Sequence, residues 1–163
     1  MKKFLVDAME SSKLIALYVN KEDSEEFIVG KVALVGERDI LAVLYDTKNM
    51  PEALCYCVVD AIYRIEQDSL YLRHIQEYQH IEFAFSEFEG PPWDSFFQMQ
   101  SRYVNYALCH LKSGELFEGK VIQHSQYAVV LSQTKNNKMS QCVTSFDRSE
   151  VAMLTVDIAN GGV

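Results

Sequence analysis

Ordered repetition is the feature that most constrains how this chain of 163 residues can fold. The tripeptide GKV at 30–32 recurs at 119–121, an offset of 89 positions. The segment VLYDTKN at 43–49 resembles VLSQTKN at 130–136, an offset of 87. One matching tripeptide arises by chance, whereas ordered matches at a similar offset predict a unit that occurs twice.

Two further matches extend the repeat toward the end of each copy. Cys57 aligns with Cys142 at an offset of 85, and Ile62 aligns with Val151 at 89 again. An offset that changes by two residues at a time predicts hairpin loops of unequal length between equivalent strands.

Each copy consists of short apolar segments separated by turn sequences such as NKEDSE and DTKNMPE, a pattern typical of strands. The first copy predicts strands at 13–19, 26–35, 39–45, 53–59 and 61–65, and the second at 105–111, 116–124, 127–133, 140–146 and 151–156. Five tightly connected strands bury enough surface only if the sheet bends and closes into a small barrel. We therefore predict a mainly all-β protein of two tandem barrels.

Gly30 and Gly119 lie inside the second predicted strand of each copy. Glycine in a strand interior marks a bend or a close approach of backbones. A long second strand that serves both sides of a small barrel has to bend sharply. These two structural glycines are therefore the predicted bending points.

Short helices are expected to flank the barrels. FLVDAMESS predicts one before the first copy, and DSFFQMQSRYV predicts one before the second, with Asp94 as its N-cap. Between the copies, DSLYLRHIQEYQH predicts a connecting helix capped by Asp68, while the alternation of IEFAFSEF at 81–88 favours an added strand. The predicted division is a first barrel at 1–67, a connecting segment at 68–93 and a second barrel with its helix at 94–163.

Composition and charge limit the classes of function. The formal net charge of -8 and the pI of about 5.0 work against a nonspecific nucleic-acid binder, because phosphates attract clustered Lys and Arg. The opening MKKFLVDAMESS lacks the apolar core of a secretory signal, and no segment approaches about 18 uninterrupted apolar residues. The four cysteines are not expected to form a disulfide framework. These features predict a soluble protein in the reducing cytoplasm, with no membrane partner.

Residues 94–131 carry a resemblance to a known family. A helix containing a Phe pair is followed by ALCHLKSGELFEGKVIQHSQYAVVL, which has a strand, a tight turn, a glycine in the second strand and a Gln-aromatic turn before an aliphatic third strand. This order resembles the Sm-like family, in particular its bacterial RNA chaperones of the Hfq type. The first copy shares only the glycine and the aliphatic pattern. The resemblance implies two tandem Sm-like, SH3-like five-stranded barrels.

The resemblance also implies an RNA site in the second barrel. In the family, the turn before strand three and the turn before strand five together hold a uridine. Gln126 and Tyr127 occupy the stacking position, and Arg148 is the cation of the later turn. The alternative is a turn aromatic that covers the barrel mouth, with a solvated Arg. Lys135 and Lys138 could follow a nucleic-acid backbone, although two lysines in a polar turn are more often only solvated.

The sequence favours neither catalysis nor metal binding. Cys55 and Cys57 point to one face of a strand, which does not suit zinc, and the four histidines are scattered. The chain contains no nucleophile elbow, no phosphate-binding glycine loop and no clustered His and carboxylate set. We therefore predict no enzyme activity, no metal, no cofactor and no small-molecule substrate.

The function predicted first is a non-enzymatic binding and assembly module that acts through barrel edges and loops. Open barrels leave the fourth and fifth strands able to pair with a neighbour, and the Sm-like resemblance implies ring formation by that route. A protein partner or self-association is expected. The sequence leaves open whether the two barrels pair with each other or act as separate ring subunits. The alternative is RNA binding through the second barrel, which the net charge disfavours.

Overall fold

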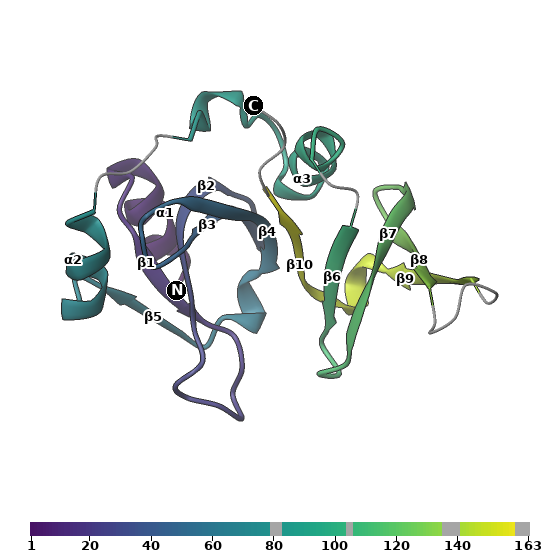
Figure 1. The fold of residues 1–163 in the computed structure, drawn as a ribbon, viewed down its shortest axis with the longest axis horizontal. Helices are drawn as coiled ribbons and strands as arrows, with labels where there is room; N and C mark the ends of the chain where they lie inside the picture. Colours follow the sequence, from purple (N-terminus) through teal and green to yellow (C-terminus); the bar gives the residue numbers. More distant parts are fainter. Residues whose placement is uncertain (79–82, 104–105, 135–140, 159–163) are drawn as a thin grey trace.

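A computed structural model of the chain describes residues 1–78, 83–103, 106–134 and 141–158. This part of the chain is mainly β, with ten strands in one antiparallel sheet and three α-helices (Figure 1). All ten predicted strands are present. The fifth lies at 64–67 instead of 61–65, because a 3-10 turn occupies Val59–Ala61.

The strand bounds follow the alternating apolar segments closely. The first half of the sheet contains β1 (Ile15–Tyr18), β2 (Ile28–Val35), β3 (Asp39–Tyr45), β4 (Pro51–Val58) and β5 (Arg64–Gln67). The second half contains β6 (Tyr106–Leu111), β7 (Leu116–His124), β8 (Ala128–Thr134), β9 (Gln141–Asp147) and β10 (Val151–Asp157).

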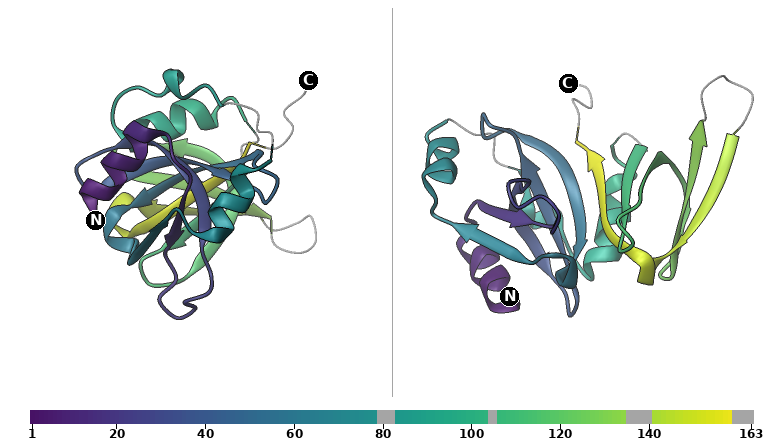
Figure 2. Two further views of the ribbon diagram at one scale, coloured as in Figure 1. Left: turned by 90° about the vertical axis from the view of Figure 1, so that its left-hand side faces the viewer. Right: turned by 90° about the horizontal axis from the view of Figure 1, so that it is seen from below.

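The two halves have the same strand order. The first half runs β5-β1-β2-β3-β4 across the sheet, and the second continues it as β10-β6-β7-β8-β9. At the junction, β4 pairs antiparallel with β10, with Tyr56 opposite Leu154, and the right panel of Figure 2 shows the two strands side by side. The sequence left open whether the two halves pair with each other, and the structure shows that they do. The edge N–H and C=O groups of β4 and β10 bond to each other, which joins both halves into one sheet.

The register shows which residues of the two halves are equivalent. Ile40 lies opposite Cys57 in the first half, and Val129 lies opposite Phe146 in the second, so both members of the pair are offset by 89 positions. The counterpart of Cys57 is therefore Phe146 and not Cys142. The predicted offsets of 87 and 85 are wrong, because they came from coincidental identities rather than from strand pairing.

The first strands of the two halves have a larger offset. Ile15 lies opposite Gly30 as Ala107 lies opposite Gly119, which offsets β1 from β6 by 92 positions. The hairpin from Ile15 to Gly30 is thus three residues longer than the equivalent hairpin from Ala107 to Gly119.

Gly30 and Gly119 lie where neighbouring backbones approach closely. A Cβ at Gly30 would lie 2.8 Å from the carbonyl oxygen of Val43, and one at Gly119 would lie 2.7 Å from that of Ser132. The register of β2 against β3, and of β7 against β8, shifts just after each glycine, which marks a β-bulge. A larger residue at either position would push two paired strands apart.

The helices are α1 (Lys2–Ser11), α2 (Leu70–Gln76) and α3 (Pro92–Gln100). The predicted cap of α2 is one residue off, because the Ser69 hydroxyl, and not Asp68, accepts the N–H of Leu72 at 3.3 Å. Among the described helices, none has the length and apolar character to cross a bilayer.

The third helix begins two residues before its predicted cap. Pro91 is the N-cap and Pro92 is the first helical residue, where proline loses no hydrogen bond. Asp94 lies in the first turn, where its carboxylate faces the positive end of the helix dipole. The prediction of Asp94 as N-cap is therefore wrong.

The strand predicted at 81–88 is absent from the part that the structure describes. Residues 83–88 contain a 3-10 turn, Phe85–Glu87, while residues 81 and 82 lie outside the described ranges. Phe83 stacks on Phe88 with ring centroids 5.7 Å apart, and Phe85 lies 5.9 Å from Phe83. The alternation of aromatic residues therefore reflects a cluster of three rings and not a strand.

The sheet has a hydrophobic cluster on each face. Tyr56 and its partner Leu154 belong to one cluster, while Cys57 and its partner Met153 belong to the other. Cys57 and its counterpart Phe146 belong to different clusters, so equivalent positions of the two halves face opposite sides of the shared sheet. The helix α1 covers the second cluster, where its Leu5 is fully buried.

Candidate functional site at the junction of the halves

The helix α3 lies over the junction and contacts both halves. It packs against β3 and β4 of the first half. Its Trp93 is fully buried and donates its indole N–H to the backbone oxygen of Ser125 in the β7–β8 turn, at 2.7 Å. The Trp93 ring also meets the ring of Tyr56 edge-on, with centroids 5.0 Å apart. One side chain thus links the fourth strand of the first half to a turn of the second.

An ion pair joins the halves beside this helix. Arg148, in the turn between β9 and β10, places a guanidinium nitrogen 2.9 Å from Oδ2 of Asp39 at the start of β3. The Asp39 side chain is only 8% exposed, and that of Arg148 is 35% exposed. The guanidinium carbon also lies 5.0 Å from the centre of the Trp93 ring, which is a cation–π distance.

Burial and charge shift two groups of this site. Burial raises the pKa of Tyr56 to about 12, with Asp39 adding to the effect and Arg148 opposing it. Burial disfavours the charge of Arg148, but its hydrogen bonds and charge interactions with Tyr56 and Asp39 outweigh that effect and raise its pKa. Across the ordinary pH range, Arg148 is therefore a cation and Tyr56 is neutral.

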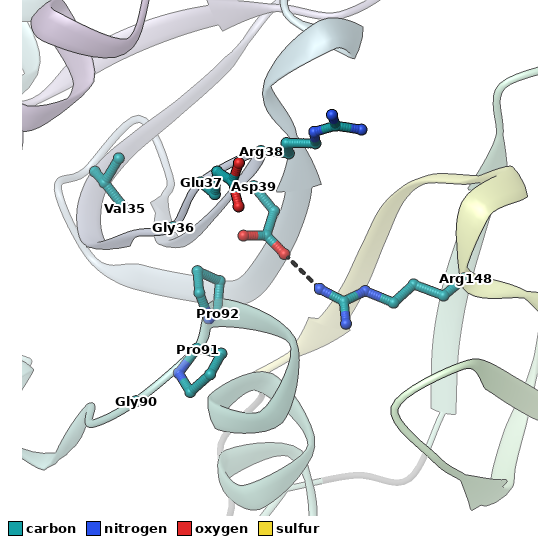
Figure 3. A pocket seen from close by; sticks show the side chains of 9 residues that line it. All are labelled: Val35, Gly36, Glu37, Arg38, Asp39, Gly90, Pro91, Pro92 and Arg148. Atoms are coloured by element: carbon teal, nitrogen blue, oxygen red, sulfur yellow. Dashed lines mark hydrogen bonds and ion pairs between the residues drawn. The ribbon is translucent and has the colours of Figure 1, made fainter.

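A hollow of about 420 Å³ opens next to the ion pair (Figure 3). Its walls are the β2–β3 turn, the segment Gly90–Pro92 and Arg148. Figure 3 shows the Arg38 side chain extending away from the two prolines, while Arg148 reaches across to Asp39. The guanidinium of Arg148 is already paired with the carboxylate of Asp39, so an anionic ligand in this hollow would compete with Asp39.

The structure brings together three of the predicted site residues. The backbone N–H of Arg148 donates to the oxygen of Tyr127 at 2.7 Å, and its guanidinium donates to the oxygen of Gln126 at 3.3 Å. These contacts reach backbone atoms, while the Tyr127 side chain is 70% exposed. Lys135 and Lys138 lie outside the described residues.

The sequence did not indicate the partners of Arg148. Asp39 lies 109 positions earlier, and no motif connects the two residues. Trp93 is the only tryptophan of the chain and follows two prolines. This sequence could have indicated a helix whose first turn is held in place by a buried aromatic side chain. The role of Tyr56 depends on the pairing of β4 with β10, which no local pattern reports.

The other side chains that could bind a metal, a histidine and the cysteines, are packed against their neighbours or buried. His124 stacks on Phe97 with centroids 4.3 Å apart. The cysteines are free, and burial raises the pKa of Cys57 and of Cys109 to about 12. Within the described ranges, no three His, Cys, Asp or Glu side chains converge as a metal site would require.

The two end strands of the sheet form a second candidate site. Within the described part, β5 pairs only with β1, and β9 pairs only with β8 (Figure 2, right panel). Because the N–H of Arg148 points toward β8, alternation along the strand directs the N–H of Ser145 to the free side. Val143 on the same strand is 58% exposed. Unpaired edge groups of this kind are templates for pairing with another strand.

Comparisons of the chain with protein-family models, with characterised proteins and with solved structures give no match. The function is therefore inferred from the geometry of the junction and of the free edges.

Proposed function

We propose that this protein is a non-enzymatic assembly module, built of two Sm-like five-stranded barrels, that joins further copies of itself head to tail. The observation that supports the proposal most strongly is the pairing of β4 with β10 inside the chain. That junction pairs the fourth strand of one half with the fifth strand of the other. The free end strands, β9 and β5, are again a fourth and a fifth strand.

Association of β9 with β5 of another copy would repeat the internal junction. Such an interface joins two different surfaces, so it produces a closed ring if the rotation closes and a filament if it does not. The Sm-like resemblance favours a ring, and three copies would give six barrels. Backbone hydrogen bonds would hold the paired strands together, whereas the net charge of -8 on each copy opposes their association.

The internal junction also supplies the register of the proposed one. Leu154 lies opposite Tyr56 inside the chain. At the offset of 89 positions, Leu154 corresponds to Ile65 and Tyr56 corresponds to Ser145. The proposed pairing therefore places Ile65 of one copy opposite Ser145 of the next.

Light scattering over a wide concentration range tests the proposal. The wild-type protein is expected to exceed the monomer mass, and Ser145→Pro is expected to be monomeric, because proline removes an edge donor without removing a bond to β8. Ser145→Thr keeps the N–H and is the matched control, and circular dichroism verifies that each variant folds. A wild-type protein that stays strictly monomeric at all concentrations would contradict self-assembly.

RNA binding is the second candidate function, favoured by the exposed ring of Tyr127 beside Gln126 and Arg148. The pairing of Arg148 with Asp39 and the net charge of -8 weigh against it. Binding of oligo-U and oligo-A is measured at low and moderate salt, with Tyr127→Ala and Arg148→Ala beside the wild type. A binding signal that is lost in both variants supports RNA binding. The absence of binding even at low salt favours the assembly module.

A further inference from the structure

The first helix carries a large exposed apolar side chain whose counterpart in the second half is buried. The offset of 92 positions that relates β1 to β6 also aligns Phe4 with Phe96 and Leu5 with Phe97. Leu5 and Phe97 are both buried, at 0% and 2% exposure. Phe96 is 0% exposed, but Phe4 is 59% exposed. The two helices therefore agree in burial at Leu5 and Phe97 but differ at Phe4 and Phe96.

The contacts of Phe96 show what that face does in the second half. The helix α3 packs on β3 and β4, and the Phe96 ring lies 6.4 Å from the ring of Tyr56. Tyr56 is paired with Leu41 across these two strands. The helix of the second half thus packs on the third and fourth strands of the first half.

The strands β8 and β9 form the equivalent packing surface in the second half. At the offset of 89, Leu41 corresponds to Val130 and Tyr56 to Ser145, and these two residues are again paired. Val143, which corresponds to the fully buried Leu54, is 58% exposed. Because a serine stands where the first half has a tyrosine, side chains cover less of the β8–β9 surface than of the β3–β4 surface.

We propose that the Phe4 face of α1 docks on the outer face of β8 and β9 of a second copy. This inference rests on the proposed head-to-tail association, and it names the second contact surface of that association. The occupant is a copy of the same chain because both surfaces are counterparts of a contact that the chain already makes internally. Pairing of β9 with β5 carries α1 of the second copy to the position that α3 holds over β4.

The proposed contact has a different chemistry from the internal junction. Asp39 and Arg148, which form the internal ion pair, correspond to Ala128 and Val59 at the offset of 89. An apolar pair therefore replaces the ion pair between copies. Association through this surface is expected to weaken little with added salt, because screening acts on charges and not on apolar contacts.

The test uses Phe4→Asp and Val143→Asp, with Leu116→Asp as the matched control. Leu116 is 56% exposed and lies at the other end of β7 from the β7–β8 turn. The dissociation constant is measured by sedimentation velocity. Each of the first two variants is expected to weaken self-association by about tenfold or more, which corresponds to about 1.4 kcal/mol, while the control changes it little.

Mixing the two variants gives a sharper result. The Phe4→Asp protein keeps an intact β8–β9 face, and the Val143→Asp protein keeps an intact α1 face. An equimolar mixture is therefore expected to form dimers of one copy of each, and to stop there because the remaining ends are both defective.

Two outcomes overturn the inference, and they are distinguishable. If Phe4→Asp associates like the wild type while Ser145→Pro is monomeric, strand pairing alone carries the association and the helix contact is wrong. If the wild type itself is monomeric, the proposed assembly fails and the inference fails with it.

Discussion

Trp93→Phe tests whether α3 fastens the two halves together. The indole of Trp93 donates a 2.7 Å hydrogen bond to Ser125, contacts the guanidinium of Arg148 at 5.0 Å and is fully buried against Tyr56. Phenylalanine keeps an aromatic ring in place but removes the N–H donor and part of the volume. The substitution therefore isolates the contacts that reach across the junction.

The expected cost is about 2–3 kcal/mol of unfolding free energy. The lost hydrogen bond contributes ~1 kcal/mol. The weaker cation–π contact contributes ~0.5 kcal/mol, because Arg148 is partly exposed to solvent. The space left by the smaller ring contributes ~1 kcal/mol, and Trp93→Ala, which leaves a larger void, is expected to cost ~3–5 kcal/mol.

Urea unfolding followed by circular dichroism measures this cost, because the substitution removes the only tryptophan and with it the fluorescence signal. Tyr106→Phe, at a side chain that is 49% exposed, is the control and is expected to change stability by less than ~0.5 kcal/mol. A Trp93→Phe protein as stable as this control would refute the reasoning, because α3 would then not hold the junction.

Three further predictions concern the strands, the ion pair and the thiols. Gly119→Ala is expected to cost ~1–3 kcal/mol in thermal or urea unfolding, because its Cβ would lie 2.7 Å from a backbone oxygen; unchanged stability would show that the strands can separate freely. Arg148→Met is expected to lower the free energy of unfolding by ~2 kcal/mol, which is less than the loss of a fully buried ion pair because Arg148 is 35% exposed. A double variant that also carries Asp39→Asn should lose less stability than the sum of the two single variants. At pH 8, below the raised pKa values of Cys57 and Cys109, a thiol reagent should modify Cys142 and spare the buried cysteines; rapid modification of all four in the folded protein would contradict their burial.

The strands were predictable because their information is local. Alternating apolar residues and turn sequences lie within single elements, so all ten strands could be read from the chain. The caps were predicted less well, since Asp68 and Asp94 each lie close to a better or earlier start, Ser69 and Pro91. The aromatic alternation at 83–88 misled because three rings that pack on each other give the same pattern as a strand.

The junction was not predictable because it joins distant parts of the chain. Asp39 and Arg148 are 109 positions apart, and each is an ordinary surface residue type. The pairing of the two halves was left open for the same reason, since pairing of β4 with β10 depends on the edges of two folded halves. The duplication itself was detectable, although only the offset of 89 positions survived, because two of the matching segments were coincidental.

Disulfide trapping tests the proposed pairing of β5 with β9 most directly. Inside the chain, Thr155 lies opposite Cys55, and their counterparts at the offset of 89 are Glu66 and Thr144. Residues opposite each other on antiparallel strands have Cα atoms about 4.5–5.5 Å apart, which a disulfide can bridge. All variants also carry Cys142→Ser, so that the nearest native thiol is absent.

An equimolar mixture of Glu66→Cys and Thr144→Cys proteins, oxidised under mild conditions, is expected to form a disulfide-linked dimer that contains one copy of each. The mixture of Glu66→Cys with Ser145→Cys, which is shifted by one residue, should cross-link much less. Equal cross-linking in both mixtures, or none from an associated protein, would contradict head-to-tail pairing of these strands.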